Sequence, residues 1–370
     1  MDISELYMSR CLELAMHGRG NVAPNPMVGA VIECDGRIIG EGYHRCYGEP
    51  HAEVNAIASV KDESLLRRST LYVNLEPCSH YGKTPPCSEL IVRKGIPRVV
   101  VACLDPYPEV AGRGIKMLRE AGIEVVSGVM EQEAVKLNRY FITAHRKHRP
   151  YIILKWAQSR DKFIDRIRTD VSEKPAMLST PMTRMMVHKL RSEVQAIMIG
   201  TNTAILDNPS LTVRYWAGES PARILVDRKL RIPEDYKLFD GTQRTIVYTK
   251  KKSKDIGQNF HDKTNIEYVE MDNSIHFLIN IMKSLYEKNI YSLLVEGGAE
   301  LHNSFMENEL WDEIMIETVP VHLRNGVGSA RFHEIENEHL SEKFLVPKLS
   351  IVSEKRSVIE HYINCAILKK

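Results

Sequence analysis

The sequence predicts an α/β protein built from two domains, residues 1–146 and 150–370. The first observation is the length, because 370 residues exceed one typical domain and fit two or three. The second is a pattern found in both halves, in which short apolar runs typical of buried strands alternate with segments of helical periodicity. The third is the composition, 43% hydrophobic and 26% charged, which supplies enough apolar side chains for a full core.

The first half is predicted to alternate helices and strands, starting with a hairpin that turns at Cys34-Asp-Gly-Arg37. The expected elements are a helix over 2–19, a hairpin over 27–40, a helix over about 52–60, a strand over 70–75, a helix over 87–94, a strand over 98–102, a helix over 113–121 and a strand over 124–126. This order predicts a layered domain with helices covering a central sheet. A last helix from about Glu131 ends in the basic run 145–150, interpreted as a solvated helix end and linker.

The second half restarts the same pattern at Tyr151 and shows no internal repeat of the first. The expected strands cover 151–155, 194–199, 222–226, 245–248, 292–295, 314–318, 349–352 and 361–368, with an apolar helix around 301–306. These elements predict a second α/β domain.

Charge and composition exclude several classes of protein. Lys and Arg number 50 against 48 Asp and Glu, and no basic run with interleaved aromatics is present, which argues against a nucleic-acid binder. The N-terminus carries acidic residues early and lacks the apolar core of a secretory signal, and no stretch is long and apolar enough for a membrane span. Seven cysteines, an odd and scattered set, indicate thiols rather than a disulfide scaffold. The expected compartment is therefore the cytosol.

The most specific chemical signal is a potential zinc site made of His51, Cys78 and Cys87. One histidine and two cysteines supply three ligands, and a tetrahedral catalytic site leaves its fourth position for water. Bound zinc lowers the pKa of that water to roughly 7. Glu53 stands two residues after His51, where a carboxylate can take up the water proton and deliver it to a leaving amine.

The spacing of these residues favours a catalytic zinc site over its alternatives. A His-x-Glu triplet alone arises readily by chance, whereas two further cysteines downstream, one in a Pro-Cys pair after a strand, make coincidence hard to sustain. A structural zinc site and unrelated thiols remain the other interpretations. Of the remaining cysteines, Cys46 is interpreted as structural or incidental, and small core residues are expected at Cys11, Cys34, Cys103 and Cys365.

The zinc-dependent nucleobase deaminases share His-x-Glu followed by Pro-Cys-x-x-Cys. Here the two cysteines are separated by a longer loop, residues 79–86. The chain resembles the bifunctional deaminase-reductases of riboflavin biosynthesis, most specifically over residues 24–113. The resemblance is carried by that loop, by the turn Pro24-Asn-Pro-Met-Val-Gly29 and by the segments His51–Asn55 and Glu76–Cys87. The resemblance implies an N-terminal cytidine-deaminase-like three-layer domain followed by a dihydrofolate-reductase-like α/β domain.

The resemblance also implies the activity. A phosphoribosylated diaminopyrimidine would be hydrolytically deaminated with one zinc ion per chain, and its ribose would then be reduced to a ribityl chain with NADPH. By position, His51, Cys78 and Cys87 match the family's zinc ligands and Glu53 its proton shuttle. The expected partner is this small phosphorylated substrate, without nucleic acid or membrane, and the assembly is expected to be a homo-oligomer.

Substrate contacts in the deaminase half are less specific. A pyrimidine bearing a ribose phosphate needs hydrogen bonds to the base edge and an anion contact. The candidates are Asn25, His44 and His80 for the heterocycle and Lys83 for the phosphate. Each of the four has the alternative interpretation of an ordinary loop residue.

The reductase half has one local signal, the turn Val295-Glu-Gly-Gly-Ala299 before a helix, where backbone N–H groups can bind a phosphate. No Gly-x-Gly-x-x-Gly is present, and a tight strand-to-helix connection is the alternative. By resemblance, the NADPH site is formed by Ala157, Thr203, Asp207, Gly297, Gly298, Ala299, Glu300 and Leu301. By the same resemblance, the substrate would be held by Arg191, Leu211, Arg214 and Glu296. Lys155 and Asp207 are the catalytic candidates, and the division of roles between them stays open.

This half departs from the family pattern at two places. Ser159-Arg-Asp-Lys162 lacks a glycine at an apparent turn, and Met177 stands where a tryptophan is often found. No site is therefore assigned over residues 165–177, although reductase activity is expected to be retained. Two other functions are compatible with parts of this pattern: a deaminase acting on nucleic acid, and a zinc-stabilised binding protein. The lack of a basic stripe opposes the first, and Glu53 beside the ligands opposes the second.

Overall fold

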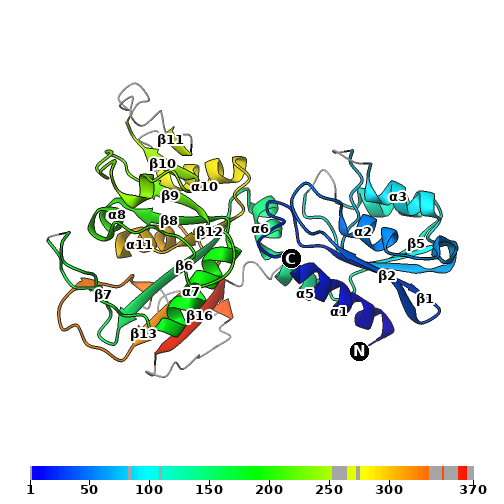
Figure 1. Cartoon of the computed structure of the whole chain (residues 1–370), viewed down its shortest axis with the longest axis horizontal. Helices are drawn as coiled ribbons and strands as arrows, with labels where there is room; N and C mark the ends of the chain where they lie inside the picture. The colour runs from blue at the N-terminus through cyan, green and yellow to red at the C-terminus, as the bar shows by residue number, and fades with distance from the viewer. Residues whose placement is uncertain are drawn as a thin grey trace. The chain divides into compact units, whose positions relative to one another are not determined.

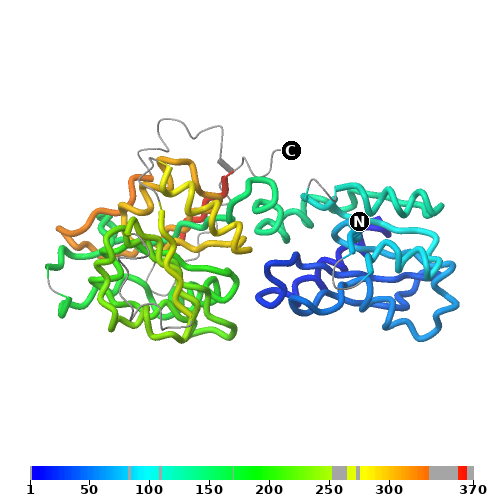
Figure 2. Tube along the Cα trace, turned by 90° about the horizontal axis from the view of Figure 1, so that it is seen from above, coloured from blue at the N-terminus to red at the C-terminus, as the bar shows by residue number. Residues whose placement is uncertain are grey.

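The computed structural model describes residues 2–81, 85–107, 111–169, 171–251, 265–271, 276–332, 344–345 and 357–364. It forms two compact units, Met1–His148 and Arg149–Lys370, drawn in Figures 1 and 2. Each unit combines one main sheet with helices, so the predicted α/β class is confirmed. Among the helices in these ranges, none has both the length and the apolar composition needed to cross a membrane.

The first unit is built on a five-stranded sheet of order β2-β1-β3-β4-β5. Its strands are β1 (Gly29–Cys34), β2 (Arg37–Tyr43), β3 (Thr70–Leu75), β4 (Arg98–Cys103) and β5 (Glu124–Ser127). Strand β1 runs antiparallel to β2 and β3, and β3, β4 and β5 are parallel. The helices are α1 (Ile3–Met16), α2 (Ala52–Ala58), α3 (Cys87–Lys94), α4 (Arg113–Glu120), α5 (Glu131–Leu137) and α6 (Arg139–Lys147), with a 3-10 turn at Glu63–Arg68.

Alternation along the strands produces two separate cores in this unit. Val31 and Tyr72 pack with α1 and α5, whereas their neighbours Ile32 and Leu71 pack with α2 and α3 on the opposite face. Figure 1 shows α1 and α5 on one side of the sheet and α2 and α3 on the other. Gly29 allows α1 to approach closely, because a Cβ there would lie 2.1 Å from a backbone oxygen of that helix. The predicted three-layer arrangement is therefore confirmed.

The second unit contains a nine-stranded sheet of order β11-β10-β9-β8-β12-β6-β13-β16-β15. Its strands are β6 (Tyr151–Ser159), β8 (Ala196–Gly200), β9 (Ala222–Val226), β10 (Thr245–Thr249), β11 (Ile266–Glu270), β12 (Ser292–Val295), β13 (Glu313–Val319), β15 (Phe344–Leu345) and β16 (Val358–Asn364). The strands are parallel up to β13, and β16 and β15 add antiparallel pairs. A two-stranded sheet pairs β7 (Phe163–Asp165) with β14 (Val327–Gly328).

The helices of this unit are α7 (Pro181–Glu193), α8 (Thr201–Asp207), α10 (Phe277–Glu287) and α11 (Ala299–Glu307), with a 3-10 turn at Lys237–Phe239. Figure 1 draws α7 on the near side of the sheet and α11 on its far side. Phe277 of α10 and Phe305 of α11 pack with Ile152 and Leu293 in one apolar core. Both helices therefore cover the same face of the sheet.

The structure corrects some sequence-based boundaries. The helix expected from Glu131 to the basic run breaks at Asn138, whose side chain accepts a hydrogen bond from the Met27 N–H and donates one to the Met27 carbonyl. Helices α7, α8 and α10 were not anticipated as elements. The strand expected over 349–352 lies outside the described residues, and the last described strand ends at Asn364.

Candidate active sites

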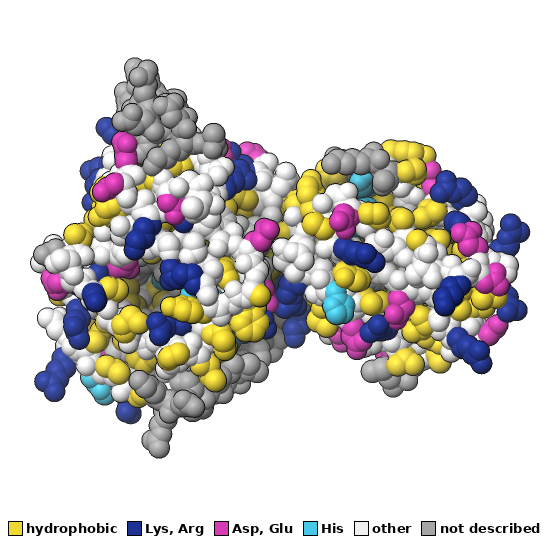
Figure 3. Space-filling view, in the orientation of Figure 1, with side chains coloured by type: hydrophobic (Ala, Val, Ile, Leu, Met, Phe, Trp, Pro, Cys, Tyr) yellow, Lys and Arg dark blue, Asp and Glu magenta, His cyan; other side chains and the backbone are white. Residues whose placement is uncertain are grey.

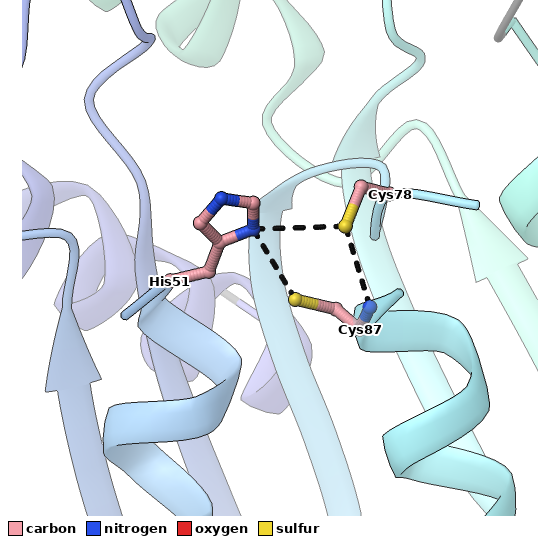
Figure 4. Close-up of side chains that lie close together, drawn as sticks. All are labelled: His51, Cys78 and Cys87. Atoms are coloured by element: carbon pink, nitrogen blue, oxygen red, sulfur yellow. Dashed lines mark hydrogen bonds between the residues drawn. The ribbon is translucent and has the colours of Figure 1, made fainter. Parts of the chain in front are cut away.

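The three predicted zinc ligands come together at the ends of three different elements. His51 is the residue before α2, Cys78 follows β3, and Cys87 begins α3. The Nδ1 atom of His51 lies 3.6 Å from the Cys78 Sγ and 3.3 Å from the Cys87 Sγ, as Figure 4 shows. All three ligand atoms lie within 4.8 Å of one another.

These distances can be compared with those of a zinc centre. Zinc–ligand bonds of about 2.0–2.3 Å in tetrahedral geometry place neighbouring nitrogen and sulfur atoms about 3.5 Å apart. The two N–S distances, 3.6 and 3.3 Å, lie close to that value. Two sulfurs and one imidazole nitrogen are also ligands that zinc prefers, so the residues fit a zinc ion with one position left for another ligand.

The surroundings favour one thiolate in this cluster. The backbone N–H of Cys87 donates to the Cys78 Sγ at 3.3 Å. Hydrogen bonds from Cys87 and His51 lower the pKa of Cys78, and the Cys87 pKa is raised by its hydrogen bond to Cys78 and by burial. The hydrogen bond to Cys78 raises the pKa of His51 to about 8. The cluster can thus carry the negative charge that a divalent cation needs.

Glu53 lies in the first turn of α2 with only 3% of its surface exposed. Burial, followed by the nearby charge of Cys78, raises the pKa of its carboxyl to about 7. A carboxyl with such a pKa can both accept and release a proton near neutrality. Glu53 therefore has the properties required of a proton carrier next to the three ligands.

Two of the predicted substrate contacts lie beside this cluster. The His44 ring meets the His51 ring edge-on, with centroids 5.5 Å apart. Its Nδ1 lies 3.2 Å from the Pro50 carbonyl, which can only accept, so Nδ1 carries the proton and Nε2 accepts from the Asn25 amide at 3.1 Å. Burial lowers the pKa of His44, which keeps the ring neutral.

The other two predicted contacts are placed differently. His80 is exposed, and no hydrogen bond joins it to the ligand cluster among the described residues. Lys83 lies outside the described residues.

A buried carboxylate, Glu76, anchors the segment that carries Cys78. One of its oxygens accepts the N–H groups of Asp105 and Gly112, and the other accepts those of Gly114 and Ile115, at 2.9–3.2 Å. The end of β3 is thereby tied to the start of α4. Glu76 belongs to the sequence motif, but the N–H groups that it accepts lie about 30 to 40 residues away in the chain. The nearby sequence therefore gave no indication that Glu76 anchors this segment.

The predicted reductase residues line two cavities of about 540 and 640 Å³ in the second unit, volumes within the range of small-molecule sites. The smaller cavity is lined by Thr203, Gly297, Gly298, Glu300 and Leu301, and by three cations, Arg228, Lys229 and Arg231. The larger is lined by Lys155, Ala157, Arg191, Thr203, Asp207, Arg214, Glu296, Gly298, Ala299 and Glu300, among others. Leu211 is buried at a positive φ of 53° and belongs to neither set.

The wall shared by the two cavities fits an anionic cofactor. Gly298 has a φ of 72°, and a Cβ there would lie 3.2 Å from the Thr203 hydroxyl oxygen. Helix α11 begins at the next residue, so its free N–H groups are available to phosphate oxygens. The three cations of the smaller cavity add positive charge to that cavity.

Ion pairs organise the larger cavity. Arg191 donates two hydrogen bonds to Glu296, at 2.8 and 2.7 Å, and a third to the Thr212 carbonyl. Burial lowers the pKa of Lys155, while Glu296 and Glu317 oppose that shift. Glu296 is itself buried, yet its pKa is lowered because Arg191 and Lys155 outweigh the desolvation.

Asp207 has a partner that the sequence did not reveal. Arg168 pairs with both Asp165 and Asp207, and its side chain is only 4% exposed. Burial raises the pKa of Asp207, and Arg168 limits that shift. Arg168 lies 39 residues from Asp207 in the chain, within the stretch to which no site was assigned.

A left-handed residue stands in the turn that lacks the family glycine. Lys162 adopts a φ of 67°, and its N–H donates to the Ser159 carbonyl at 3.0 Å. Asp161 reinforces this loop by accepting the N–H groups of Leu323 and Arg324. The departure in sequence is therefore absorbed as one left-handed residue, at a cost of about 1–2 kcal/mol. Met177 lines the larger cavity and is 71% exposed.

Comparisons with known proteins agree with this architecture. The family described as the cytidine and deoxycytidylate deaminase zinc-binding region matches residues 1–103, and the RibD C-terminal domain matches residues 150–340. The riboflavin biosynthesis protein RibD of Aquifex aeolicus is 40% identical over 339 residues, which cover 90% of this chain and 92% of the relative. This chain belongs to the RibD family. The RibD protein of Escherichia coli is 35% identical over 85% of this chain and 87% of its own length.

A solved RibD-type structure matches the whole fold. The diaminohydroxyphosphoribosylaminopyrimidine deaminase/5-amino-6-(5-phosphoribosylamino)uracil reductase of Thermotoga maritima has a TM-score of 0.83 and 35% identity, over 98% of this chain and 99% of that one. The predicted family and the pairing of a zinc-binding deaminase with a reductase in riboflavin biosynthesis are therefore confirmed. The expected homo-oligomer and cytosolic location stay predictions.

Proposed function

We propose that the first unit deaminates a phosphoribosylated diaminopyrimidine by hydrolysis, using His51, Cys78 and Cys87 as zinc ligands and Glu53 as proton carrier. The observation that carries the proposal is the convergence of the three ligand atoms within 4.8 Å of one another. Zinc, when bound, acts as a Lewis acid that makes water a better nucleophile at neutral pH. Glu53 would accept a proton from the water that attacks the amino-bearing carbon and would pass it to the departing nitrogen, which leaves as ammonia.

The neighbouring side chains would orient the pyrimidine. The proton on the His44 Nδ1 is engaged with the Pro50 carbonyl, and the Asn25 amide donates to Nε2. Asn25 keeps a second amide hydrogen and its carbonyl oxygen for the edge of the base. The pair therefore offers both a donor and an acceptor close to the ligand cluster.

The second unit is proposed to reduce the ribose of the deaminated product with NADPH. The nicotinamide would supply hydride, and the protein's part is to bind and orient. The Gly297-Gly298 turn and the start of α11 would hold the cofactor phosphates. Lys155 is the better proton donor to the opening sugar, because burial lowers its pKa and leaves its proton easier to release. Asp207, fixed by Arg168, would position the reactants.

Glu53→Gln tests the deaminase step. The amide keeps the size of the side chain but cannot carry the proton, so ammonia release from the diaminopyrimidine should fall by a factor of about 10² to 10⁴. Zinc content by elemental analysis should stay at one ion per chain, and NADPH oxidation with the deaminated intermediate should be unchanged. The matched control is Glu49→Gln, an exposed acid two residues before His51. Normal ammonia release by Glu53→Gln would exclude the proposed role.

A further inference from the structure

A lysine and a glutamate lie on neighbouring strands at the sheet face opposite the apolar core of the second unit. Strands β6 and β13 are parallel and adjacent, with Ala157 of β6 opposite Glu317 of β13 (Figure 1). Trp156 and Ile316 belong to the apolar core on the side of α10 and α11. Side chains alternate along a strand, so their neighbours Lys155, Ala157 and Glu317 point to the other face. Lys155 is therefore a diagonal neighbour of Glu317, within reach of a long side chain.

This face of the sheet forms part of the wall of the larger cavity. Lys155 and Ala157 both line the cavity, and so does Ser179, whose hydroxyl donates to the Glu317 Oε2 at 2.6 Å. Figure 3 shows Lys and Arg side chains around a hollow in this unit. Glu317 is only 2% exposed, so its carboxylate lies against the cavity wall and away from bulk water.

One oxygen of the Glu317 carboxylate has no partner within the described part of the chain. Ser179 occupies Oε2, whereas the buried Oε1 accepts no hydrogen bond there. An unpaired oxygen on a buried carboxylate costs free energy unless a donor reaches it. Lys155 is a cation on the same face of the sheet, and its flexible four-carbon side chain can turn its ammonium group toward that oxygen.

The charges around Lys155 balance when Glu317 is counted. The charged and titratable groups that act on Lys155 are Glu296, Glu317, Arg191 and His302. Both oxygens of Glu296 accept hydrogen bonds from Arg191, so these two charges compensate each other. His302 is neutral because burial lowers its pKa to about 4. Glu317 is thus the carboxylate left to compensate Lys155, and with Glu296 it opposes the lowering of the Lys155 pKa by burial.

We propose that Glu317 is a positioning residue of the reductase, whose free carboxylate oxygen keeps the Lys155 ammonium protonated and in place at the cavity wall. The proposal rests on the proposed role of Lys155 as proton donor, and it adds Glu317, which neither the motifs nor the family resemblance singled out. A buried ammonium loses its proton readily, whereas a carboxylate within reach favours the charged form. Glu317, fixed by Ser179, lets Lys155 keep its proton at neutral pH until the opening sugar takes it.

Labelling of Lys155 tests this contact in the ligand-free protein. Competitive acetylation with acetic anhydride over a range of pH, followed by mass spectrometry of the peptide that contains Lys155, reports where the amine loses its proton. Glu317→Gln keeps the size of the side chain and removes its charge, so acetylation of Lys155 should begin at lower pH than in wild type. Glu317→Asp keeps the charge and should lie between the two.

The matched control for labelling is Glu313→Gln. Glu313 is a buried glutamate of the same strand, but it binds Tyr151 and His361 and lines neither cavity. Acetylation of Lys155 in Glu313→Gln should follow the wild-type pH profile. A wild-type profile in Glu317→Gln, or the same shift in both variants, would overturn the proposal.

Kinetics separate this role from a general loss of structure. With NADPH and the deaminated intermediate, Glu317→Gln should lower kcat by about 10-fold at about pH 8 and approach the wild-type kcat as the pH is lowered, because Lys155 regains its proton there. The KM for NADPH should not change. A loss of kcat that is equal at every pH would give Glu317 a structural role only and refute the proposal. Full-rate reduction by Lys155→Ala would refute the proposed proton donor, and a labelling shift would then support the contact of Glu317 with Lys155 alone.

Discussion

Glu76→Gln is expected to destabilise the first unit and weaken its hold on zinc. The buried carboxylate accepts four backbone N–H groups, two on each oxygen. Glutamine keeps one carbonyl oxygen and replaces the other with an NH₂ donor, so two of these N–H groups lose their acceptor. At about 1–3 kcal/mol for each unsatisfied buried donor, the free energy of unfolding should fall by about 2–6 kcal/mol. Cys78 lies two residues further along the same segment, so zinc should be lost more readily.

The two units can be followed separately during denaturation. All three tryptophans, Trp156, Trp216 and Trp311, belong to the second unit, so their fluorescence reports on that unit alone, whereas far-ultraviolet circular dichroism reports on both. Glu76→Gln should move the dichroism transition of the first unit to lower denaturant and leave the tryptophan transition in place. Glu120→Gln, an exposed acid on α4, is the control and should change stability little. If the free energy of unfolding of Glu76→Gln lies within about 0.5 kcal/mol of the wild-type value and the variant keeps its zinc after dialysis, Glu76 does not anchor the segment that carries Cys78.

Two further predictions concern the second unit. Arg149→Met should lower the free energy of unfolding by about 3–5 kcal/mol, because it leaves the fully buried Asp312 carboxylate without the guanidinium that binds both its oxygens. Adding Asp312→Asn should restore part of that loss. Equal stability of Arg149→Met and wild type in urea would contradict this prediction. Burial lowers the pKa of His302 to about 4, below the unfolded value of about 6.5, so its contribution to stability is complete above pH 6.5 and is lost as pH falls towards 4. The urea concentration at the midpoint of unfolding, followed by tryptophan fluorescence, should therefore fall as the pH is lowered over that range, and should fall less steeply in His302→Leu. Identical pH profiles of the variant and the wild type would exclude His302 as the cause.

The sequence predicted what is encoded locally. The strand over 70–75 and the helix over 87–94 were predicted with the bounds that the structure gives them, because the local sequence pattern indicates both. The clustering of His51, Cys78 and Cys87 was also predictable, because these residues have metal-binding side chains and stand at the ends of predicted elements.

What could not be predicted depends on contacts between distant residues. The helix break at Asn138 arises from hydrogen bonds to Met27, 111 residues away. The pairing of Arg168 with Asp207 likewise joins residues that no periodicity connects.

Removal and return of zinc test the central assignment most directly. Protein stripped with a chelator should stop releasing ammonia from the diaminopyrimidine, keep oxidising NADPH with the deaminated intermediate, and regain deamination when one equivalent of zinc is added. Cys87→Ser protein should not regain it, because one of the three converging ligand atoms is lost. Metal-free protein that deaminates at the full rate would contradict the account.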